Sequence, residues 1–268
     1  MTPLIAFTSD FGQRDHYVGV VHGVIAGISP QARVIDLTHG VPAQDVKSGA
    51  LALYAGCQHF PVGTIHLAVV DPGVGTARRA LLLRTERFWF VGPDNGLLTL
   101  AAPLEALLGC WELTNSAYHL PTRSTTFHGR DLFGPVAAYL ANGVPPEEFG
   151  PAAPAPLALP DLVLAPIGRG STLGTVLAID GFGNMLTSLK GSTTWDDALR
   201  SGTISAWLAG RQLRPVRTYQ EGAHGELLLL AGSAGLLEVA VANGSASASA
   251  GIGVGASVRV VISESRLA

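Results

Sequence analysis

Short apolar runs alternate with helix-length segments through the first seventy residues, and this alternation most restricts what the chain can fold into. The runs "LIAFTS" (4–9), "ARVIDLTH" (32–39) and "GTIHLAVVD" (63–71) have the length and β-branched content of buried strands. Between them, "YVGVVHGVIAGI" (17–28) and "VKSGALALYAGCQHF" (46–60) have the length and spacing of helices. Strands that alternate with helices in this way predict an α/β domain whose central, mostly parallel sheet is flanked by helices.

The chain after these elements continues the same domain. "RALLLRTERFWFVGPDNGLLTLAA" (79–102) predicts a hairpin or two adjacent strands closing on a Gly-Pro turn. "RDLFGPVAAYLANG" (130–143) predicts a helix that starts late or kinks at Pro135, because proline lacks the N–H group that a helix interior uses.

A proline-rich segment separates two regions of different texture. "VPPEEFGPAAPAPLALPD" (144–161) has almost no periodicity and favours extended chain, as linkers do. Beyond it, short β-type runs are separated by Gly, Asn and Ser, which predicts a small antiparallel barrel or sandwich. We therefore predict an α/β N-terminal domain (1–150), a proline-rich linker (151–168) and an all-β, barrel-like C-terminal domain (169–268).

Composition narrows the class of protein. Charged residues make up only 14% of the chain, against roughly 25% in typical soluble domains, which favours an oligomer that hides uncharged surface. The net charge is −3 and the basic residues are scattered, so no nucleic-acid partner is expected. The longest uncharged stretch (239–258) is too rich in Gly, Ser and Asn for a membrane helix. The N-terminus has no signal-peptide pattern, so we expect a cytoplasmic protein without a membrane partner.

Several carboxylates stand where predicted strands become loops. Asp10 follows the first strand, Asp71 ends the third, and Asp94 lies in "VGPDNG". In open α/β sheets, ligands bind beyond the carboxyl ends of the strands, so Asp10 and Asp71 would share one rim if their strands run parallel. The alternative for any one of them is a role in building a turn, where aspartate is common.

A glycine-rich turn and a histidine complete the candidate site. In "VVDPGVGTARR" (69–79), the turn returns Arg78 toward Asp71. In "TFHGRDLFGP", His128 stands at a helix entrance, and Asp131 has the competing role of helix N-cap. The chain has no phosphate-binding loop, no nucleophile elbow and no metal-ligand spacing, and its cysteines look like small buried hydrophobes. The residues alone predict an Asp/Arg/His site for a small polar molecule, without a metal.

Seven motifs, taken together, resemble the S-adenosylmethionine hydrolase (S-adenosylmethionine hydroxide adenosyltransferase) family, a sister of the adenosyl fluorinases and chlorinases. They occur in order over nearly the whole chain: "TSDFGQRDHYVG", "IDLTHGVPAQDV", "VVDPGVGTARR", "VGPDNGLL", "TFHGRDLFGPVAA", "IDGFGNMLTSL" and "GSAGLLEVAVANGSAS". The resemblance implies an α/β domain linked to a β-barrel-like domain in a homotrimer. Each S-adenosylmethionine would lie between one subunit's N-terminal domain and its neighbour's C-terminal domain. Water would split it into adenosine and methionine, with no cofactor.

The resemblance also implies roles for individual residues. Asp71, Arg78 and His128 match the family's catalytic set. The positions that match substrate-binding residues are Asp10 at the ribose hydroxyls, Asp71, which would also hold Arg78 or the ribose in place, Asn184 and Ala246 near the adenine and ligand, and Asp180, Ser233 and Glu238 in the second domain, of which Asp180 and Ser233 lie at the methionine end. Asp94 and Asn95 are motif residues whose role stays open between a ligand contact and turn building. Ser188 departs from the family pattern, in which Thr-Asn commonly stands at this point.

The implied mechanism is attack of water at C5′ of the sulfonium, from which a neutral thioether leaves. Arg78 would orient and polarise the water, while Asp71 and His128 would accept hydrogen bonds or a proton. Which residue is the base stays open, because coupled groups titrate as a unit.

Two alternatives belong to other classes of function. A halide adenosyltransferase would need a dry anion pocket, and the carboxylate at Asp71 would repel a halide there. A non-catalytic protein that binds S-adenosylmethionine or adenosine would keep Asp10, Asn184 and Ser233. It would have no need for Arg78 and His128.

Overall fold

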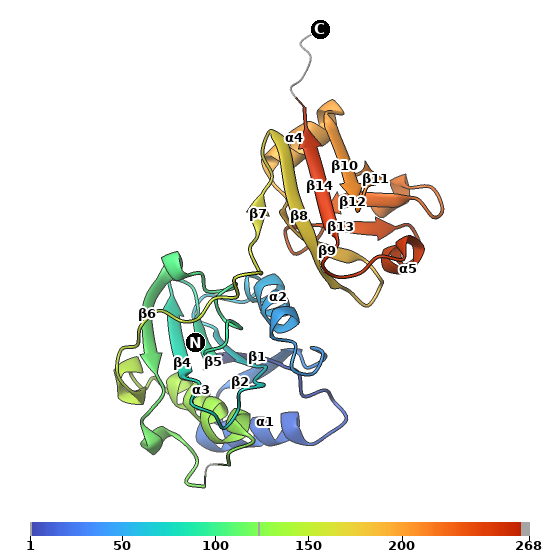
Figure 1. The fold of residues 1–268 in the computed structure, drawn as a ribbon. Coiled ribbons are helices and arrows are strands. Elements are labelled where there is room, and N and C mark those ends of the chain that lie inside the picture. The colour runs from blue at the N-terminus through green and yellow to red at the C-terminus, as the bar shows by residue number, and fades with distance from the viewer. Residues whose placement is uncertain (1, 123, 264–268) are drawn as a thin grey trace. The chain divides into compact units, whose positions relative to one another are not determined.

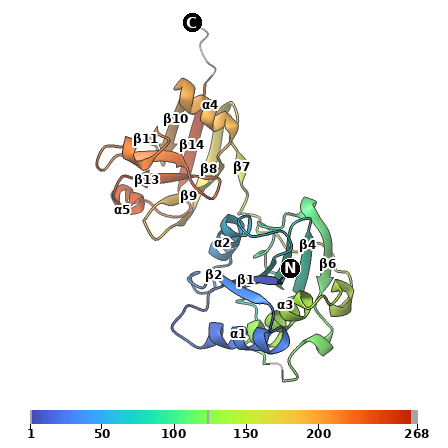
Figure 2. The ribbon, with the colours of Figure 1, turned by 180° about the vertical axis from the view of Figure 1, so that it is seen from behind.

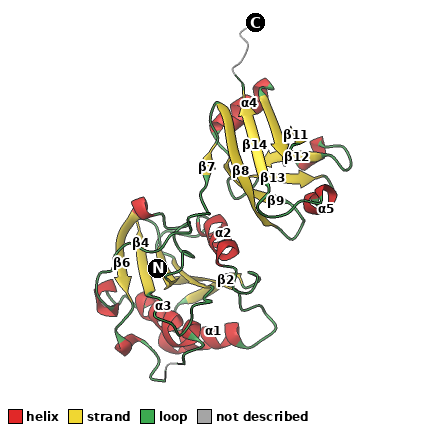
Figure 3. Ribbon diagram, viewed as in Figure 1, coloured by secondary structure: helices red, strands yellow, loops and turns green. Residues whose placement is uncertain are grey.

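The computed structural model describes residues 2–122 and 124–263 and divides into two compact units, Met1–Pro160 and Asp161–Ala268. Unit 1 combines helices with a central sheet, whereas unit 2 is built almost entirely of strands (Figures 1 and 3). The predicted fold class, an α/β domain followed by an all-β barrel-like domain, is confirmed.

Unit 1 is built on a six-stranded mixed sheet with the strand order β2-β1-β3-β5-β4-β6. The strands β2, β1, β3 and β5 run parallel to one another, and β4 is antiparallel to both β5 and β6. Their bounds are β1 Leu4–Ser9, β2 Arg33–Thr38, β3 Ile65–Val69, β4 Ala80–Thr85, β5 Trp89–Pro93 and β6 Leu107–Glu112. The predicted hairpin is β4 and β5, but its turn lies at 86–88, and the Gly-Pro dipeptide ends β5 instead.

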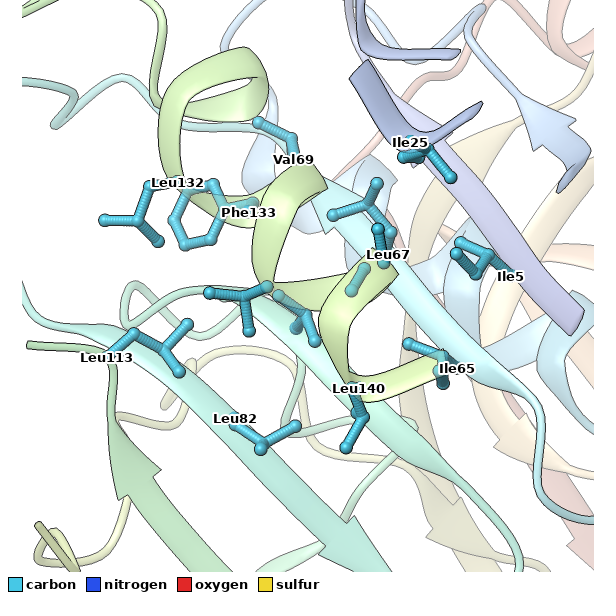
Figure 4. Close-up of a cluster of buried hydrophobic side chains, with 14 of the residues drawn as sticks. Ile5, Ile25, Ile65, Leu67, Val69, Leu82, Leu113, Leu132, Phe133 and Leu140 are labelled. Carbon is cyan, nitrogen blue, oxygen red and sulfur yellow. The ribbon is translucent and has the colours of Figure 1, made fainter. Parts of the chain in front are cut away.

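Helices cover both faces of this sheet, so its central strands are apolar on both sides. The helices α1 (Tyr17–Ile28) and α3 (Gly134–Ala141) lie on one side, and α2 (Val46–Cys57) lies on the other (Figures 1 and 2). In β4, Leu82 joins the cluster under α1 and α3, drawn in Figure 4, while its neighbour Leu83 joins the cluster under α2. Burying each such side chain stabilises the fold by roughly 1.5–3 kcal/mol.

The third helix starts at the proline as predicted, but a different kind of helical turn precedes it. A π-helical turn, η3 (Gly129–Phe133), precedes α3, and Pro135 lies in the first turn of α3, where the missing N–H is tolerated. Four residues earlier, the carbonyl of Asp131 receives no helical hydrogen bond from Pro135. It instead accepts the backbone N–H of Leu120 at 2.9 Å. The α-helix therefore starts late, at Gly134, as predicted, but a π-helical turn that the sequence did not predict precedes it, and His128 stands immediately before that turn.

Unit 2 is a seven-stranded barrel with the order β13-β12-β11-β10-β14-β8-β9, closed by pairing of β9 with β13. Closure removes open sheet edges. Its strands are β8 Gly170–Ile179, β9 Met185–Lys190, β10 Ile204–Leu208, β11 Arg211–Pro215, β12 Leu227–Ala231, β13 Leu236–Val241 and β14 Ser257–Ile262, and β7 (Ala165–Pro166) adds to β9. The helices are α4 Thr193–Ser201 and α5 Ala246–Ala250. Short 3₁₀ turns in the two units are η1 Leu104–Ala106, η2 Ser116–Tyr118, η4 Pro146–Phe149 and η5 Tyr219–Glu221.

The motif residues Asp94 and Asn95 bind parts of unit 1 together. Asp94 accepts Arg79 Nε at 2.9 Å and the backbone N–H of Leu157 at 2.7 Å, which ties the proline-rich segment to the sheet. Asn95 donates from Nδ2 to the carbonyl of Val70 at 2.8 Å. These contacts assign both residues a structural role in this unit.

Two features bear on the expectations drawn from composition. Across residues 2–122 and 124–263, no helix has the length and apolar character needed to cross a membrane.

Cys57 and Cys110 are free thiols, and burial raises the pKa of the Cys57 thiol to about 11. Cys57 therefore behaves as the small buried hydrophobe that the sequence predicted.

His66 is an unusual residue in the core of unit 1. Its ring packs against the aromatic rings of Phe60, Phe88 and Phe90 at centroid distances of 5.4, 5.0 and 5.2 Å. Neither ring nitrogen has a hydrogen-bond partner in the part of the chain that the structure describes. Burial lowers the pKa of His66 to about 4, so its imidazole is neutral in the folded protein at neutral pH.

Replacing His66 with phenylalanine is expected to reduce the loss of stability in acid. In the unfolded chain the imidazole protonates below its ordinary pKa of 6.5, whereas in the folded protein it stays neutral until about pH 4. The unfolded state therefore binds the proton first, and the free energy of unfolding falls as the pH drops through this window. His66 accounts for about 3 kcal/mol of that fall by pH 4.

Urea unfolding at pH 7 and at pH 4 measures this difference. The values at pH 7, where the imidazole is neutral in both states, isolate the effect of the substitution on packing. If the wild type and His66→Phe lose equal stability between the two pH values, His66 does not carry the effect.

Candidate active site

The carboxyl-end rim of the unit 1 sheet gathers the charged candidates of that unit. Because β1 and β3 are parallel neighbours, Asp10 and Asp71 follow their strands at the same edge. The strand β4 is antiparallel to β5 and begins where β5 ends, which brings Arg78 and Arg79 to this edge as well. Ligands bind at this rim in open α/β sheets.

The turn from Asp71 to Arg78 folds back tightly against another loop. Gly75 has a φ of +78°, and a Cβ on it would lie 2.3 Å from the carbonyl oxygen of Thr125. Only glycine allows this close approach and this backbone conformation. The hydroxyl of Thr76 accepts the backbone N–H of Arg78 at 3.3 Å and helps to hold the returning chain.

The side chains of Asp71, Arg78 and His128 contact one another. Arg78 Nε lies 2.9 Å from Asp71 Oδ1 and 3.1 Å from Oδ2, and Nη2 also donates to Oδ2. The same Nη2 lies 2.8 Å from His128 Nδ1, and the guanidinium carbon lies 5.1 Å from the centre of the Phe133 ring. The Asp71 and Arg78 side chains are only 6% and 10% exposed, so water screens their charges weakly.

The contact with Arg78 determines which nitrogen of His128 carries the proton. A guanidinium offers only N–H donors, so Nδ1 of His128 must accept, and the proton of the neutral ring is on Nε2. Asp71 has about four lone-pair positions and uses three of them for Arg78. The cluster therefore presents a hydrogen-bond donor and an anionic acceptor around one cation.

Asp10 and Asp131 belong to the same sequence motifs as the candidate residues, but their side chains bind other partners. Asp10 is half-buried, and its Oδ2 accepts the backbone N–H of Gln44 at 2.8 Å. Asp131 is no helix N-cap: it pairs with Arg130 at 2.5 Å and accepts the backbone N–H of Ser124 at 2.6 Å. Asp131 thus anchors the loop that precedes His128.

The candidates Asp180, Asn184 and Ala246 gather around one turn of unit 2. Asp180 Oδ1 accepts the backbone N–H of Asn184 at 2.9 Å, and Oδ2 accepts its side-chain Nδ2 at 3.1 Å. Gly183 has a φ of +85°, and a Cβ there would lie 2.1 Å from Ser245 Oγ. Glycine therefore lets the turn meet the start of α5, where Ala246 is the first residue.

Glu238 lies on β13 beside the same group of residues, and Ser233 lies exposed in the turn before that strand. The hydroxyl of Tyr219 donates to Glu238 Oε1. Burial raises the pKa of Glu238, and burial together with this hydrogen bond raises the pKa of Tyr219 to about 12. The negative charge of Asp180 contributes to both increases, so Asp180, Tyr219 and Glu238 share one electrostatic environment.

Ser188, where the sequence departs from the family pattern, connects two strands of the barrel. Its hydroxyl accepts the backbone N–H of Thr175 at 3.0 Å. A Cβ on Gly174 would lie only 2.8 Å from that hydroxyl, so the space around Ser188 is tight. The small serine fits this gap between β8 and β9.

Sequence reasoning missed two residues of these clusters. Phe133, under the Arg78 guanidinium, is indistinguishable in the sequence from an ordinary core residue of a helix. Tyr219 contacts Glu238 from a position nineteen residues earlier, and no local pattern marks it. The structure thus places one cluster of candidates in each unit.

Comparisons with known proteins cover both units. Sequence models of the N-terminal and C-terminal domains of SAM hydroxide adenosyltransferase match residues 5–150 and 174–259. A protein from Salinispora arenicola named (R)-S-adenosyl-L-methionine hydrolase is 44% identical over 246 residues, which are 91% of this chain and 92% of that protein. A crystal structure of an uncharacterized conserved protein from Thermotoga maritima matches with a TM-score of 0.85 and 33% identity, over 96% of this chain and 99% of that one.

A fluorinase from an Actinoplanes species is more distant, with 27% identity over 70% of this chain and 72% of its own length. The two family models together span most of the chain, and the Salinispora relative spans nine-tenths of it. The chain therefore belongs to the SAM hydroxide adenosyltransferase family.

Proposed function

We propose that the protein hydrolyses S-adenosyl-L-methionine to adenosine and L-methionine, with water as co-substrate and without a cofactor. The observation that carries this proposal is the buried contact of Asp71, Arg78 and His128 at the ligand-binding rim of unit 1. The 44% identity to a protein named as a hydrolase of this substrate supports the same reaction.

The reaction requires the protein to position a water molecule and to accept one proton, but not to activate the leaving group. The water oxygen forms a bond to C5′ as the C5′–S bond breaks, and the electron pair of that bond moves to sulfur. The positive sulfonium thereby becomes a neutral thioether, so the leaving group needs no acid. The water gives up one proton, which passes to an acceptor and then to solvent. The main task is to hold the water in line with the breaking bond, about 3–3.5 Å from C5′.

The cluster suits this task. Asp71 is the anionic group that can accept a hydrogen bond or a proton from the water, and the Nε2–H of His128 can donate to the water oxygen. Arg78 holds both partners, and its positive charge polarises the water and stabilises the hydroxide-like character that the oxygen acquires as its proton moves to Asp71. In this arrangement we assign the role of proton acceptor to Asp71 rather than to His128.

Water suits the site better than a halide. A carboxylate and a halide ion 4 Å apart repel each other by about 4 kcal/mol at an effective dielectric constant of 20. The buried Asp71 carboxylate therefore opposes a halide at the position of the nucleophile. A neutral water molecule experiences no such repulsion and gains a hydrogen bond.

Substrate recognition is assigned to residues of both units. The proposed substrate-binding residues are Asp10, Asp71, Asp180, Asn184, Ser233, Glu238 and Ala246. As the family resemblance implies, we propose a homotrimer in which unit 1 of one subunit and unit 2 of its neighbour complete each site; the candidate positions do belong to two separate compact units. The low content of charged residues, 14%, supports an assembly that hides uncharged surface.

In water enriched in oxygen-18 and with no metal added, the protein is expected to form adenosine that carries the label at the 5′ oxygen. The label enters because water is the nucleophile, and methionine should form unlabelled in equal amount. Liquid chromatography with mass spectrometry measures both products. Added chloride or fluoride should yield no 5′-halogenated adenosine; unlabelled adenosine, or no adenosine, would refute hydrolysis at C5′.

Asp71→Asn is expected to lower kcat by at least about 100-fold, because the amide keeps the shape of the side chain but loses its charge and proton affinity. Asp94→Asn is the matched control, since Asp94 forms an ion pair with the adjacent Arg79 and its side chain is only 4% exposed. Removing either carboxylate leaves a poorly compensated arginine, so both variants should lose stability. Only Asp71→Asn should lose turnover; comparable kcat values in the two folded variants would exclude the assignment.

Mixing subunits tests the proposed trimer and its shared sites. Light scattering should give three times the 27.7 kDa mass of the chain. Asp71→Asn and Asn184→Ala should each be inactive alone, while trimers co-assembled from equal amounts should regain about a quarter of the wild-type rate. This fraction follows if each site joins unit 1 of one subunit to unit 2 of the next. An active monomer, or no recovery in the mixed assembly, would contradict the shared site.

A further inference from the structure

A second cluster of ligating side chains lies around the end of β2 in unit 1. His22 comes from α1, Asp36 from β2, and His39 directly follows β2. One ligating atom of each lies within 4.8 Å of the other two. Asp36 Oδ1 is 2.8 Å from His22 Nε2 and 3.1 Å from His39 Nε2. Spacing along the sequence did not reveal this set, because His22 reaches the other two residues from a different element.

His39 is held in the orientation that a metal ligand requires. Its side chain is 1% exposed, and its Nδ1 lies 2.7 Å from Ser9 Oγ, which also accepts the backbone N–H of Phe11. If Nδ1 donates to Ser9, the lone pair of His39 is on Nε2. That nitrogen is buried and makes no hydrogen bond of acceptable geometry within the described chain, although Asp36 is close. A histidine ligand is typically fixed in this way by a hydrogen bond from its other nitrogen.

The cluster has access to open space. Asp36 and His39 line a cavity of about 340 Å³, together with Gly12, Gln13 and Thr38. His39 Nε2 itself is buried, whereas His22 and Asp36 are each about one-third exposed, so an ion would enter past these two side chains. Three protein ligands beside an open cavity are typical of a site in which water or a small ligand fills the remaining position.

We propose that His22, Asp36 and His39 bind a divalent transition-metal ion of the zinc class. Two imidazole nitrogens and one carboxylate oxygen suit Zn²⁺ and, among related ions, Co²⁺ and Ni²⁺. Ligand distances of about 2.0–2.2 Å place the donor atoms of a tetrahedral site roughly 3.3 Å apart. The present separations of 2.8 and 3.1 Å would therefore open by only a few tenths of an ångström.

The position of the ion suggests what it stabilises. Gly12 donates its backbone N–H to the carbonyl of His39 at 2.8 Å, and Ser9 contacts the His39 ring. Asp10 lies between these two attachment points. A bound ion would fix His39 and, through these two contacts, the segment that carries Asp10. We assign the ion a positioning role, separate from the Asp71, Arg78 and His128 cluster.

Cobalt(II) is the probe, because its visible absorption reports both binding and coordination geometry. The full-length, untagged protein is freed of metal with a chelator and titrated with Co²⁺. The expected result is a visible spectrum typical of four- or five-coordinate Co²⁺ that saturates at one ion per chain, is displaced by Zn²⁺, and accompanies a higher thermal unfolding midpoint. His22→Gln should weaken the affinity at least about tenfold, since it removes one ligand.

His59→Gln is the matched control, because His59 is an exposed histidine of the same unit outside the cluster. It should bind Co²⁺ as the wild type does, and unfolding of the metal-free variants verifies that both are folded. A wild type without a saturable spectrum would overturn the proposal. Equal affinity in His22→Gln and His59→Gln would also overturn it, because Co²⁺ would then be bound elsewhere.

Discussion

The buried ion pair between Asp71 and Arg78 is the interaction on which the rest of the site depends. Two charges withdrawn from water are stable together only when their remaining hydrogen-bonding capacity is satisfied. Arg78 meets this condition through three contacts with the carboxylate, one with His128 and the ring of Phe133. Asp71 belongs to the turn after β3, and His128 and Phe133 belong to the entrance to α3, so the pair fixes these two segments and the start of β4 relative to one another.

The reversed direction of β4 makes this pair possible. In an entirely parallel sheet, a strand after β3 would begin at the opposite edge, far from Asp71. Because β4 is antiparallel, it starts at the rim where β3 and β5 end. Two successive arginines at its start then serve different partners. Arg78 binds Asp71, while Arg79 binds Asp94 and two carbonyls of the proline-rich segment.

The sequence predicted what depends on local pattern and missed what depends on distant partners. The apolar runs and their spacing identified β1, α1 and β2 to within a residue, because strand and helix patterns of this kind are local to the sequence. The π-helical turn before α3 escaped prediction because its stability includes a hydrogen bond from Leu120 to Asp131. The approach of Arg78 to Asp71 was predictable from the glycine-rich turn, whereas the need for glycine at Gly75 arises from Thr125, fifty residues away.

The same ion pair links the stability of unit 1 to the choice of nucleophile. A site for a halide would require the negative charge of Asp71 to be removed, because that charge repels the ion in a poorly screened environment. Removing it alone would leave Arg78 buried without its counterion, at a cost of about 3–5 kcal/mol. Conversion to halide transfer would therefore need compensating changes at Arg78 or around it. In the proposed site, the carboxylate favours water as the nucleophile, and the arginine makes the carboxylate costly to lose.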